Sequence, residues 1–191
     1  MHGLEHLEFD NHIFFKEGKW LEEFEKEFAE RELIEVLFQQ WRKTKDKDEF
    51  LVLFVKIWLK LEDIYMHNIE KYYKKKCYEK ELFYKLLDYG KEEFSNDYKF
   101  ILMTGYIYCT TDYLFILDEV CENEMENKGK KMICELYSEN NKDFLISCFY
   151  YLIFDRKKYK KVRREKSFGK RIMQCFPSDC EIDRYFREVL S

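Results

Sequence analysis

The chain has 191 residues, of which 46% are hydrophobic, 19% aromatic and 38% charged, with one proline and a net charge of -4. It is too rich in large apolar side chains to be disordered, and its mean hydropathy of -0.60 is too low for a membrane protein. The composition therefore predicts a soluble, globular protein with a substantial core.

The cellular compartment is indicated by the start of the sequence and by its cysteines. The first residues, MHGLEHLEFDNHIFF, contain no cationic flank and no uninterrupted apolar run, so we expect neither a secretory signal nor a transit peptide. Seven cysteines, an odd number without a CxxC pair, favour free thiols in a reducing cytosol. We expect a cytoplasmic protein without a membrane partner, in which residues 1–17 form a mobile N-terminal segment.

Apolar residues recur at helical spacing along the first part of the chain. Aromatic residues at i, i+4 and i+8 predict a helix over residues 19–42. A D-x-x-E sequence at Asp46 starts the longest helix, whose apolar face continues to Tyr72. A third helix is indicated around residues 82–87, and it is closed by a turn near Ser95.

The stretch from Phe100 to Glu119 is unusually apolar. It is interrupted by Gly105 and by residues 110–112, which predicts two core helices joined by a tight turn and not a membrane span. Because glycine has no side chain, Gly105 would let a neighbouring helix approach closely, at a cost of about 1 kcal/mol in helix propensity.

The rest of the chain continues the helical pattern. Helices are expected over residues 128–137 and 142–154, and a basic helix over residues 156–174. The sequence S-D-C-E at residues 178–181 reads as a capping box, after which an apolar i, i+3, i+4 pattern predicts a docked terminal helix. The fold expected for residues 1–191 is therefore all-α and single-domain, either an irregular helical bundle or an array of antiparallel helical hairpins.

No motif in the sequence indicates an enzyme. There is no GxGxxG, Walker, HExxH or GxSxG motif. The only close histidine pair, His2 and His6, lies at an end that usually frays, and no cysteine is singled out as a nucleophile. We therefore expect a protein without catalytic activity, a metal site or another cofactor.

Acidic residues gather in two segments. Residues 1–35 contain 11 acids against 4 bases, and residues 112–126 contain six acids and no base. If residues 112–126 form a helix, Phe115 falls in the middle of its acidic face. A ring framed by carboxylates would suit a basic protein partner, unless another helix covers it. The candidate partner-binding residues are Asp112, Phe115, Asp118, Glu119, Glu122 and Glu126.

A basic segment, residues 156–171, contains ten bases and one acid. On a helix these bases spread over most of the circumference, and such a run can contact phosphates without sequence preference. The alternative is a solvated helix whose charge offsets the acidic segments, and we expect this in place of a nucleic-acid partner. The candidate nucleic-acid-binding residues are Arg156, Lys157, Lys160, Lys161, Arg163 and Arg164.

Several short motifs occur together in the C-terminal half: Gly105-Tyr106 in an apolar helix, G-K-K-M at residues 129–132, and Y-F-R-E-V-L at residues 185–190. This combination resembles the helical immunity proteins of bacterial contact-dependent growth inhibition and related toxin systems. The resemblance implies a small cytosolic protein that binds and neutralises the toxic C-terminal domain of a cognate effector. Many such toxins are nucleases with basic clefts, which an acidic surface would complement. The alternative functions are a nucleic-acid-binding protein or an adaptor that uses residues 156–171.

Overall fold

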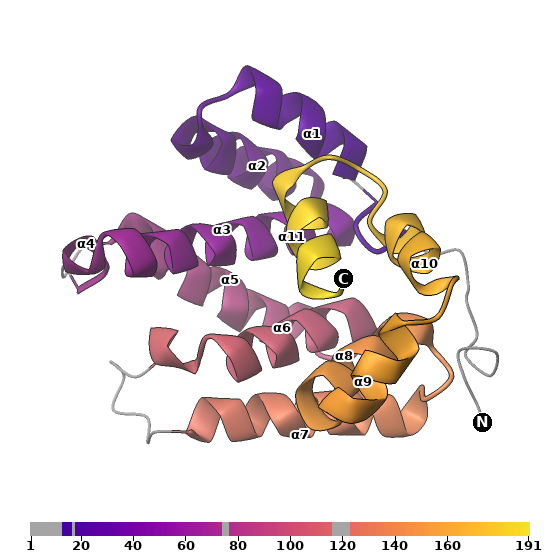
Figure 1. Cartoon of the computed structure of the whole chain (residues 1–191). Helices are drawn as coiled ribbons and strands as arrows, with labels where there is room; N and C mark the ends of the chain where they lie inside the picture. The colour runs from indigo at the N-terminus through magenta and orange to yellow at the C-terminus, as the bar shows by residue number, and fades with distance from the viewer. Residues whose placement is uncertain (1–12, 17, 74–76, 116–122) are drawn as a thin grey trace.

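The computed structural model describes residues 13–16, 18–73, 77–115 and 123–191. These ranges contain eleven α-helices and no strand, packed as one array (Figure 1), which confirms the all-α, single-domain prediction. In chain order the helices are α1 (Gly18–Glu27), α2 (Glu30–Thr44), α3 (Lys47–His67), α4 (Ile69–Tyr73), α5 (Tyr78–Glu93), α6 (Tyr98–Thr110), α7 (Glu124–Glu139), α8 (Phe144–Phe154), α9 (Arg156–Arg163), α10 (Phe168–Cys175) and α11 (Glu181–Val189). No helix in these ranges is long and apolar enough to cross a membrane.

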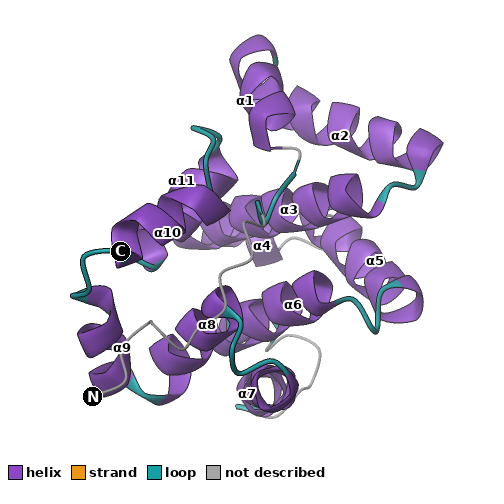
Figure 2. Ribbon diagram, turned by 90° about the vertical axis from the view of Figure 1, so that its right-hand side faces the viewer, coloured by secondary structure: helices purple, strands orange, loops and turns teal. Residues whose placement is uncertain are grey.

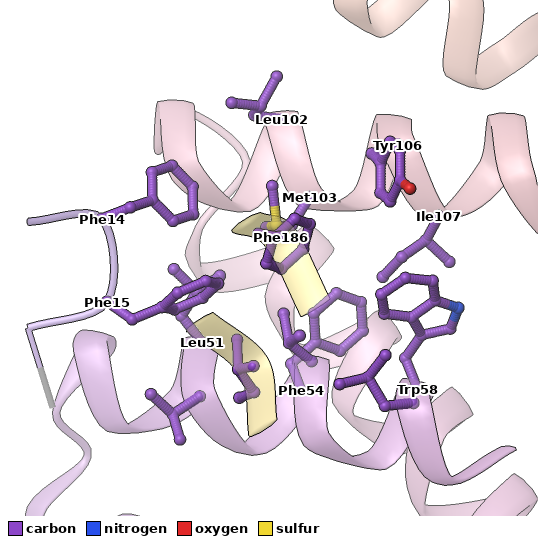
Figure 3. Packing of buried hydrophobic residues seen from close by; sticks show 14 of the residues in the cluster. Phe14, Phe15, Leu51, Phe54, Trp58, Leu102, Met103, Tyr106, Ile107 and Phe186 are labelled. Atoms are coloured by element: carbon purple, nitrogen blue, oxygen red, sulfur yellow. The ribbon is translucent and has the colours of Figure 1, made fainter. Parts of the chain in front are cut away.

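Helix α3 lies at the centre of the array and begins where the D-x-x-E sequence predicts. The Asp46 side chain accepts a hydrogen bond from the Glu49 amide at 3.0 Å, which satisfies one of the free N–H groups of the first turn. Phe54 and Trp58 of α3 face α6, and Phe186 of α11 lies between the two helices (Figure 3). The core therefore combines residues from the middle and the end of the chain.

The helix expected over residues 19–42 is two helices, and the long helix that follows is shorter than expected. The first break lies at Ala29, whose backbone is extended with a ψ of 148°. The second lies at Asn68, whose side-chain oxygen accepts a hydrogen bond from the Lys71 amide and so starts the short helix α4. Capping side chains of this kind compete with the continuation of a helix.

The basic helix expected over residues 156–174 is also divided, into α9 and α10. The reason is the direction in which its apolar residues would point around the axis of a single helix. Tyr159 and Val162 are buried on α9, and Phe168 and Ile172 are buried on α10. At 100° per residue a straight helix would place Tyr159 and Phe168 on opposite faces, and the break lets both residues face the core.

Close contact between α6 and α7 confirms the packing role predicted for Gly105. A Cβ atom added at Gly105 would lie 2.9 Å from Ile133 Cγ1, and one added at Gly129 would lie 2.5 Å from the carbonyl oxygen of Gly105. The two helices approach backbone to backbone at this point, which we call the Gly105–Gly129 contact. It fixes the position of α7, at the end of the array opposite to α1 and α2 (Figure 2).

Both terminal parts of the described chain pack onto the core. Phe14 and Phe15, within the segment expected to be mobile, are buried, and the Phe14 amide donates to the Cys175 carbonyl at 2.9 Å. Helix α11 is docked as predicted, through buried residues that include Ile182 and Phe186. The predicted capping box is wrong, because Cys180 is the N-cap residue and its side chain makes no capping hydrogen bond.

Candidate partner-binding site

The helix predicted over residues 112–126 is not continuous. A 3-10 helix spans Asp112–Leu114 and ends at Phe115, whereas α7 begins at Glu124 after Asn123, which has a positive φ of 73°. The acidic face inferred from a single helix through this segment is therefore wrong.

Phe115 is covered by the protein itself. Its side chain is 3% exposed, and its ring centroid lies 5.1 Å from that of Tyr108 and 6.0 Å from those of Phe83 and Tyr84. Tyr84 also donates a hydrogen bond to the carbonyl oxygen of Leu114, at 3.2 Å, which holds the 3-10 helix against α5. Of the two alternatives for Phe115, the structure shows the covered ring, so Phe115 is a core residue and not an exposed anchor.

The candidate acids do not surround an exposed ring in the described part of the chain. Asp112 is half-buried, and its Oδ1 accepts a hydrogen bond from the Tyr113 amide at 2.9 Å. Glu126 forms an ion pair of 2.6 Å with Lys130, one turn further along α7. The remaining acids, Asp118, Glu119 and Glu122, lie outside the described residues.

An open groove lies between the start of α6 and the C-terminal half of α7. Its volume is about 530 Å³. The floor is apolar and the rim carries two carboxylates. The groove is lined by Tyr98, Ile101, Met132, Glu135, Leu136 and Glu139, together with the polar residues Ser95, Asn96 and Asn140.

The local sequence explains how the groove is built. Asp97 caps α6 by accepting hydrogen bonds from the amides of Lys99 and Phe100, and this cap places Tyr98 in the first turn with 36% of its surface exposed. Glu135 and Glu139 are exposed and stand one turn apart on α7. The Gly105–Gly129 contact holds the two helices together beside the groove.

The charged side chains that line the groove, Glu135 and Glu139, are both acidic. The C-terminal end of α7, which carries the negative partial charge of the helix dipole, reaches the groove next to Glu139. Burial, and then the nearby charges of Asp143 and Asp97, raises the pKa of Tyr98 to about 12. Glu135 has a loose ion pair of 3.8 Å with Lys131, and both side chains are well exposed. A weak surface pair of this kind leaves most of the carboxylate's charge available to a partner.

This arrangement suits a basic side chain. The methylene groups of an arginine or lysine would pack on Ile101 and Met132, and its charged head would meet Glu135, Glu139 and the face of the Tyr98 ring. Carboxylates that bond a guanidinium or an ammonium group are among the stronger hydrogen-bond acceptors in proteins. The groove is therefore a candidate site for a cationic protein surface.

Catalytic chemistry is not indicated among the described residues. No group of three or more His, Cys, Asp or Glu side chains in those ranges is placed to hold a metal ion. Burial raises the pKa of the Cys109 and Cys175 thiols to about 12, and that of Cys148 well above its usual range. Thiols that stay protonated are poor nucleophiles, so the buried Cys148 and Cys175 and the half-buried Cys109 act as small apolar residues.

The candidate nucleic-acid-binding residues surround the outer side of α9. Tyr159 and Val162 turn inward, and all six cations are exposed: Arg156, Lys157, Lys160, Lys161, Arg163 and Arg164. Arg164 is the C-cap residue, so the six residues lie on one short helix and its cap. The structure thus brings this set together, whereas half of the acidic set lies outside the described residues.

Sequence reasoning missed the groove because its two walls are far apart in the chain. The available signals were local: the Ser95-Asn96-Asp97 turn before α6 and the spacing of two acids on α7. Comparison of the chain with family models, characterised proteins and solved structures gives no match. The function therefore has to be argued from the groove and the surface themselves.

Proposed function

We propose that this chain is an immunity protein, which binds the toxic C-terminal domain of a cognate bacterial effector and neutralises it by non-covalent contact. The observation that carries the proposal is the acidic groove between α6 and α7, which offers an apolar floor, an exposed ring and two carboxylates to a basic partner. Two of the three motifs that resemble immunity proteins, at Gly105-Tyr106 and at residues 129–132, lie on the helices that form the groove, whereas residues 185–190 lie on α11. Gly105 and Gly129 form the contact between the two helices, and Met132 lines the groove.

The proposed mechanism is competition for a basic cleft. A nuclease toxin holds its nucleic-acid substrate with arginine and lysine side chains. The carboxylates of Glu135 and Glu139 would attract the same side chains during encounter, and insertion of one of them into the groove would then slow dissociation. A stable complex buries about 1,200–2,000 Å² in total, so the groove would be the centre of a larger interface.

Coexpression tests the proposed function directly. The protein is produced in a bacterial host together with the toxic C-terminal domain encoded next to its gene, and viable cells are counted. We expect cells that produce the toxic domain alone to die and cells that produce both proteins to survive. Undiminished killing in the presence of this protein contradicts the proposal.

Charge reversal tests whether the groove is the binding site. Glu135→Lys/Glu139→Lys is expected to weaken binding to the toxin domain about 100-fold, because two close charge pairs become repulsive. The matched control is Glu23→Lys/Glu27→Lys, which reverses two exposed acids with the same spacing on α1, at the other end of the array (Figure 1). Isothermal titration calorimetry gives both affinities. If the groove variant binds the toxin domain as tightly as the wild type and still protects cells, the groove is excluded as the binding site, but the proposed immunity function is not contradicted.

A further inference from the structure

The outer side of α9 presents an unusual concentration of free positive charge. The side chains of Arg156, Lys157, Lys160, Lys161, Arg163 and Arg164 make no hydrogen bond or ion pair with any residue that the structure describes. Elsewhere on the molecule, several lysines are paired: Lys26 with Glu22, for example, and Lys60 with Glu30. These six cations therefore do not offset the acidic segments through direct contacts with described side chains.

This arrangement has an energetic cost that a polyanion would remove. Residues 156 and 160, 157 and 161, and 160 and 164 are like-charged pairs at i, i+4, a spacing at which equal charges repel across one helical turn. Two acids flank these cations in the sequence, Asp155 and Glu165. Asp155 is used as the N-cap, because its Oδ1 accepts a hydrogen bond from the Lys158 amide at 2.9 Å. A row of phosphates would replace this repulsion by attraction and release counterions.

The inner side of α9 argues against a membrane as the partner. Tyr159 and Val162 are buried in the protein core, and the Tyr159 hydroxyl donates to the Leu190 carbonyl at 2.9 Å. A helix that binds in the interface of a bilayer inserts its apolar face. In α9 that face already packs against the protein, so only the charges are available to a partner.

A series of neighbouring aromatic rings, of which the last two are tilted by 31°, leads to the end of α8. The Tyr137 and Tyr150 rings are stacked with centroids 3.9 Å apart and an interplanar angle of 9°. The Phe154 ring follows at 4.8 Å from Tyr150, and its side chain is 38% exposed. Phe154 is the last residue of α8 and lies two positions before Arg156, so a partly exposed ring stands at the junction of α8 with the basic helix.

From these observations we infer that α9 and Phe154 form a binding surface for single-stranded nucleic acid, distinct from the acidic groove. The six cations would follow the phosphates, and an unpaired base would stack on Phe154 and extend the Tyr137–Tyr150–Phe154 series. A duplex offers the same phosphates, but its bases are already stacked on one another. The exposed ring therefore favours a single strand over a duplex.

The test uses the full chain and a fluorescently labelled oligouridine of about 16 nucleotides, followed by fluorescence anisotropy at low salt. We expect the oligonucleotide to bind, and the logarithm of its association constant to fall linearly with the logarithm of the salt concentration. Lys160→Gln/Lys161→Gln/Arg163→Gln should abolish the salt-dependent binding. Lys43→Gln/Lys85→Gln, which neutralises exposed lysines elsewhere, should leave it unchanged. Absence of binding at low salt, or equal losses in the two variants, overturns the inference.

A second comparison isolates the stacked base. Phe154→Ala is expected to weaken oligouridine binding about tenfold and to leave binding of heparin, a polyanion without bases, unchanged. Equal effects on both ligands would overturn the stacking role of Phe154. Binding to phosphatidylserine vesicles without binding to oligouridine would identify a membrane surface as the partner and would also overturn the inference. Circular dichroism confirms that each variant is folded.

Discussion

Two contacts hold the helices of this protein together by different physical means. At the Gly105–Gly129 contact, backbone meets backbone and no charge is involved. Where α1 and α11 pack on the central helix α3, the buried Lys56 of α3 pairs with Glu25 of α1 at 2.8 Å and also with Glu181 of α11. We call this group the Lys56 ion-pair cluster. Added side-chain volume should destabilise the Gly105–Gly129 contact, and loss of a charge should destabilise the Lys56 ion-pair cluster. Different substitutions can therefore test the two contacts separately.

Added volume at Gly129 is expected to have the largest effect. In Gly129→Ala the new Cβ would lie 2.5 Å from the Gly105 carbonyl oxygen and 2.8 Å from Tyr108 Cβ, so α6 and α7 have to move apart. We expect the free energy of unfolding to fall by about 3 kcal/mol, which outweighs the gain of about 1 kcal/mol in helix propensity. Thermal unfolding should show a midpoint lower by roughly 6–12 °C.

Gly169 provides the control for this variant. A Cβ at Gly169, on α10, would meet no atom within 4 Å. Gly169→Ala should therefore stabilise the protein slightly, by about 0.5 kcal/mol, because alanine restricts the unfolded chain. A loss of stability in both variants would mean that close packing is not what distinguishes Gly129.

Loss of charge at Lys56 is expected to have the next largest effect. The Lys56 side chain is only 4% exposed. Burial alone would lower the pKa of its ammonium group, but the hydrogen bonds and charges of Glu181 and Glu25 outweigh burial and raise it. In Lys56→Met two carboxylates lose their partner. We expect the free energy of unfolding, measured in urea, to fall by about 2 kcal/mol, a value reduced from that of a fully buried pair because Glu181 is half exposed.

Lys60 is the matched control, one turn further along α3. It also has two acidic partners, Glu30 at 2.6 Å and Asp63 at 3.1 Å, but both of these side chains are about half exposed. Lys60→Met should lower the free energy of unfolding by less than about 1 kcal/mol, as is typical of surface ion pairs. Equal costs for the two variants would show that burial does not strengthen the Lys56 ion-pair cluster.

The features that the sequence predicted correctly depend on neighbouring residues. The cap at Asp46 needs only a residue three positions away, and the docking of α11 follows from its apolar periodicity. The small residue at Gly105 predicted a close helix neighbour without identifying it. The break between α9 and α10 was not predicted, although Tyr159 and Phe168 would fall on opposite faces of a straight helix.

The features that were missed depend on residues far apart in the chain. The groove exists because Tyr98 and Glu135 are brought together by the packing of two helices, and a single sequence contains no signal for that distance. Phe115 was misplaced because a helix was assumed to continue through it. Its neighbours Phe83 and Tyr84 come from α5, which the helical pattern of residues 112–126 does not reveal.

The smallest predicted effect concerns a buried acid beside the Lys56 ion-pair cluster. Asp183 of α11 is fully buried, and its Oδ2 accepts hydrogen bonds from the Ser178 hydroxyl at 2.7 Å and from the Ser178 amide at 2.9 Å. Its Oδ1 has no hydrogen-bond partner among the described residues. Burial raises the pKa of Asp183, although the hydrogen bonds from Ser178 and the charge of Arg187 oppose the shift.

The sign of the pH dependence follows from the raised pKa. The folded protein favours the protonated carboxyl, so Asp183 contributes stability that is fully present below its unfolded pKa of about 3.9 and is lost as the pH rises through its folded pKa. Asp183→Asn cannot lose a proton there. The stability of the variant relative to the wild type should therefore improve as the pH rises from about 3 towards 7, by about 1 kcal/mol or less. Urea unfolding of both proteins across this pH range gives the difference between their free energies of unfolding. Groups that titrate in the same way in both proteins do not contribute to this difference. A difference that stays constant with pH would show that Asp183 does not titrate differently in the folded and unfolded states.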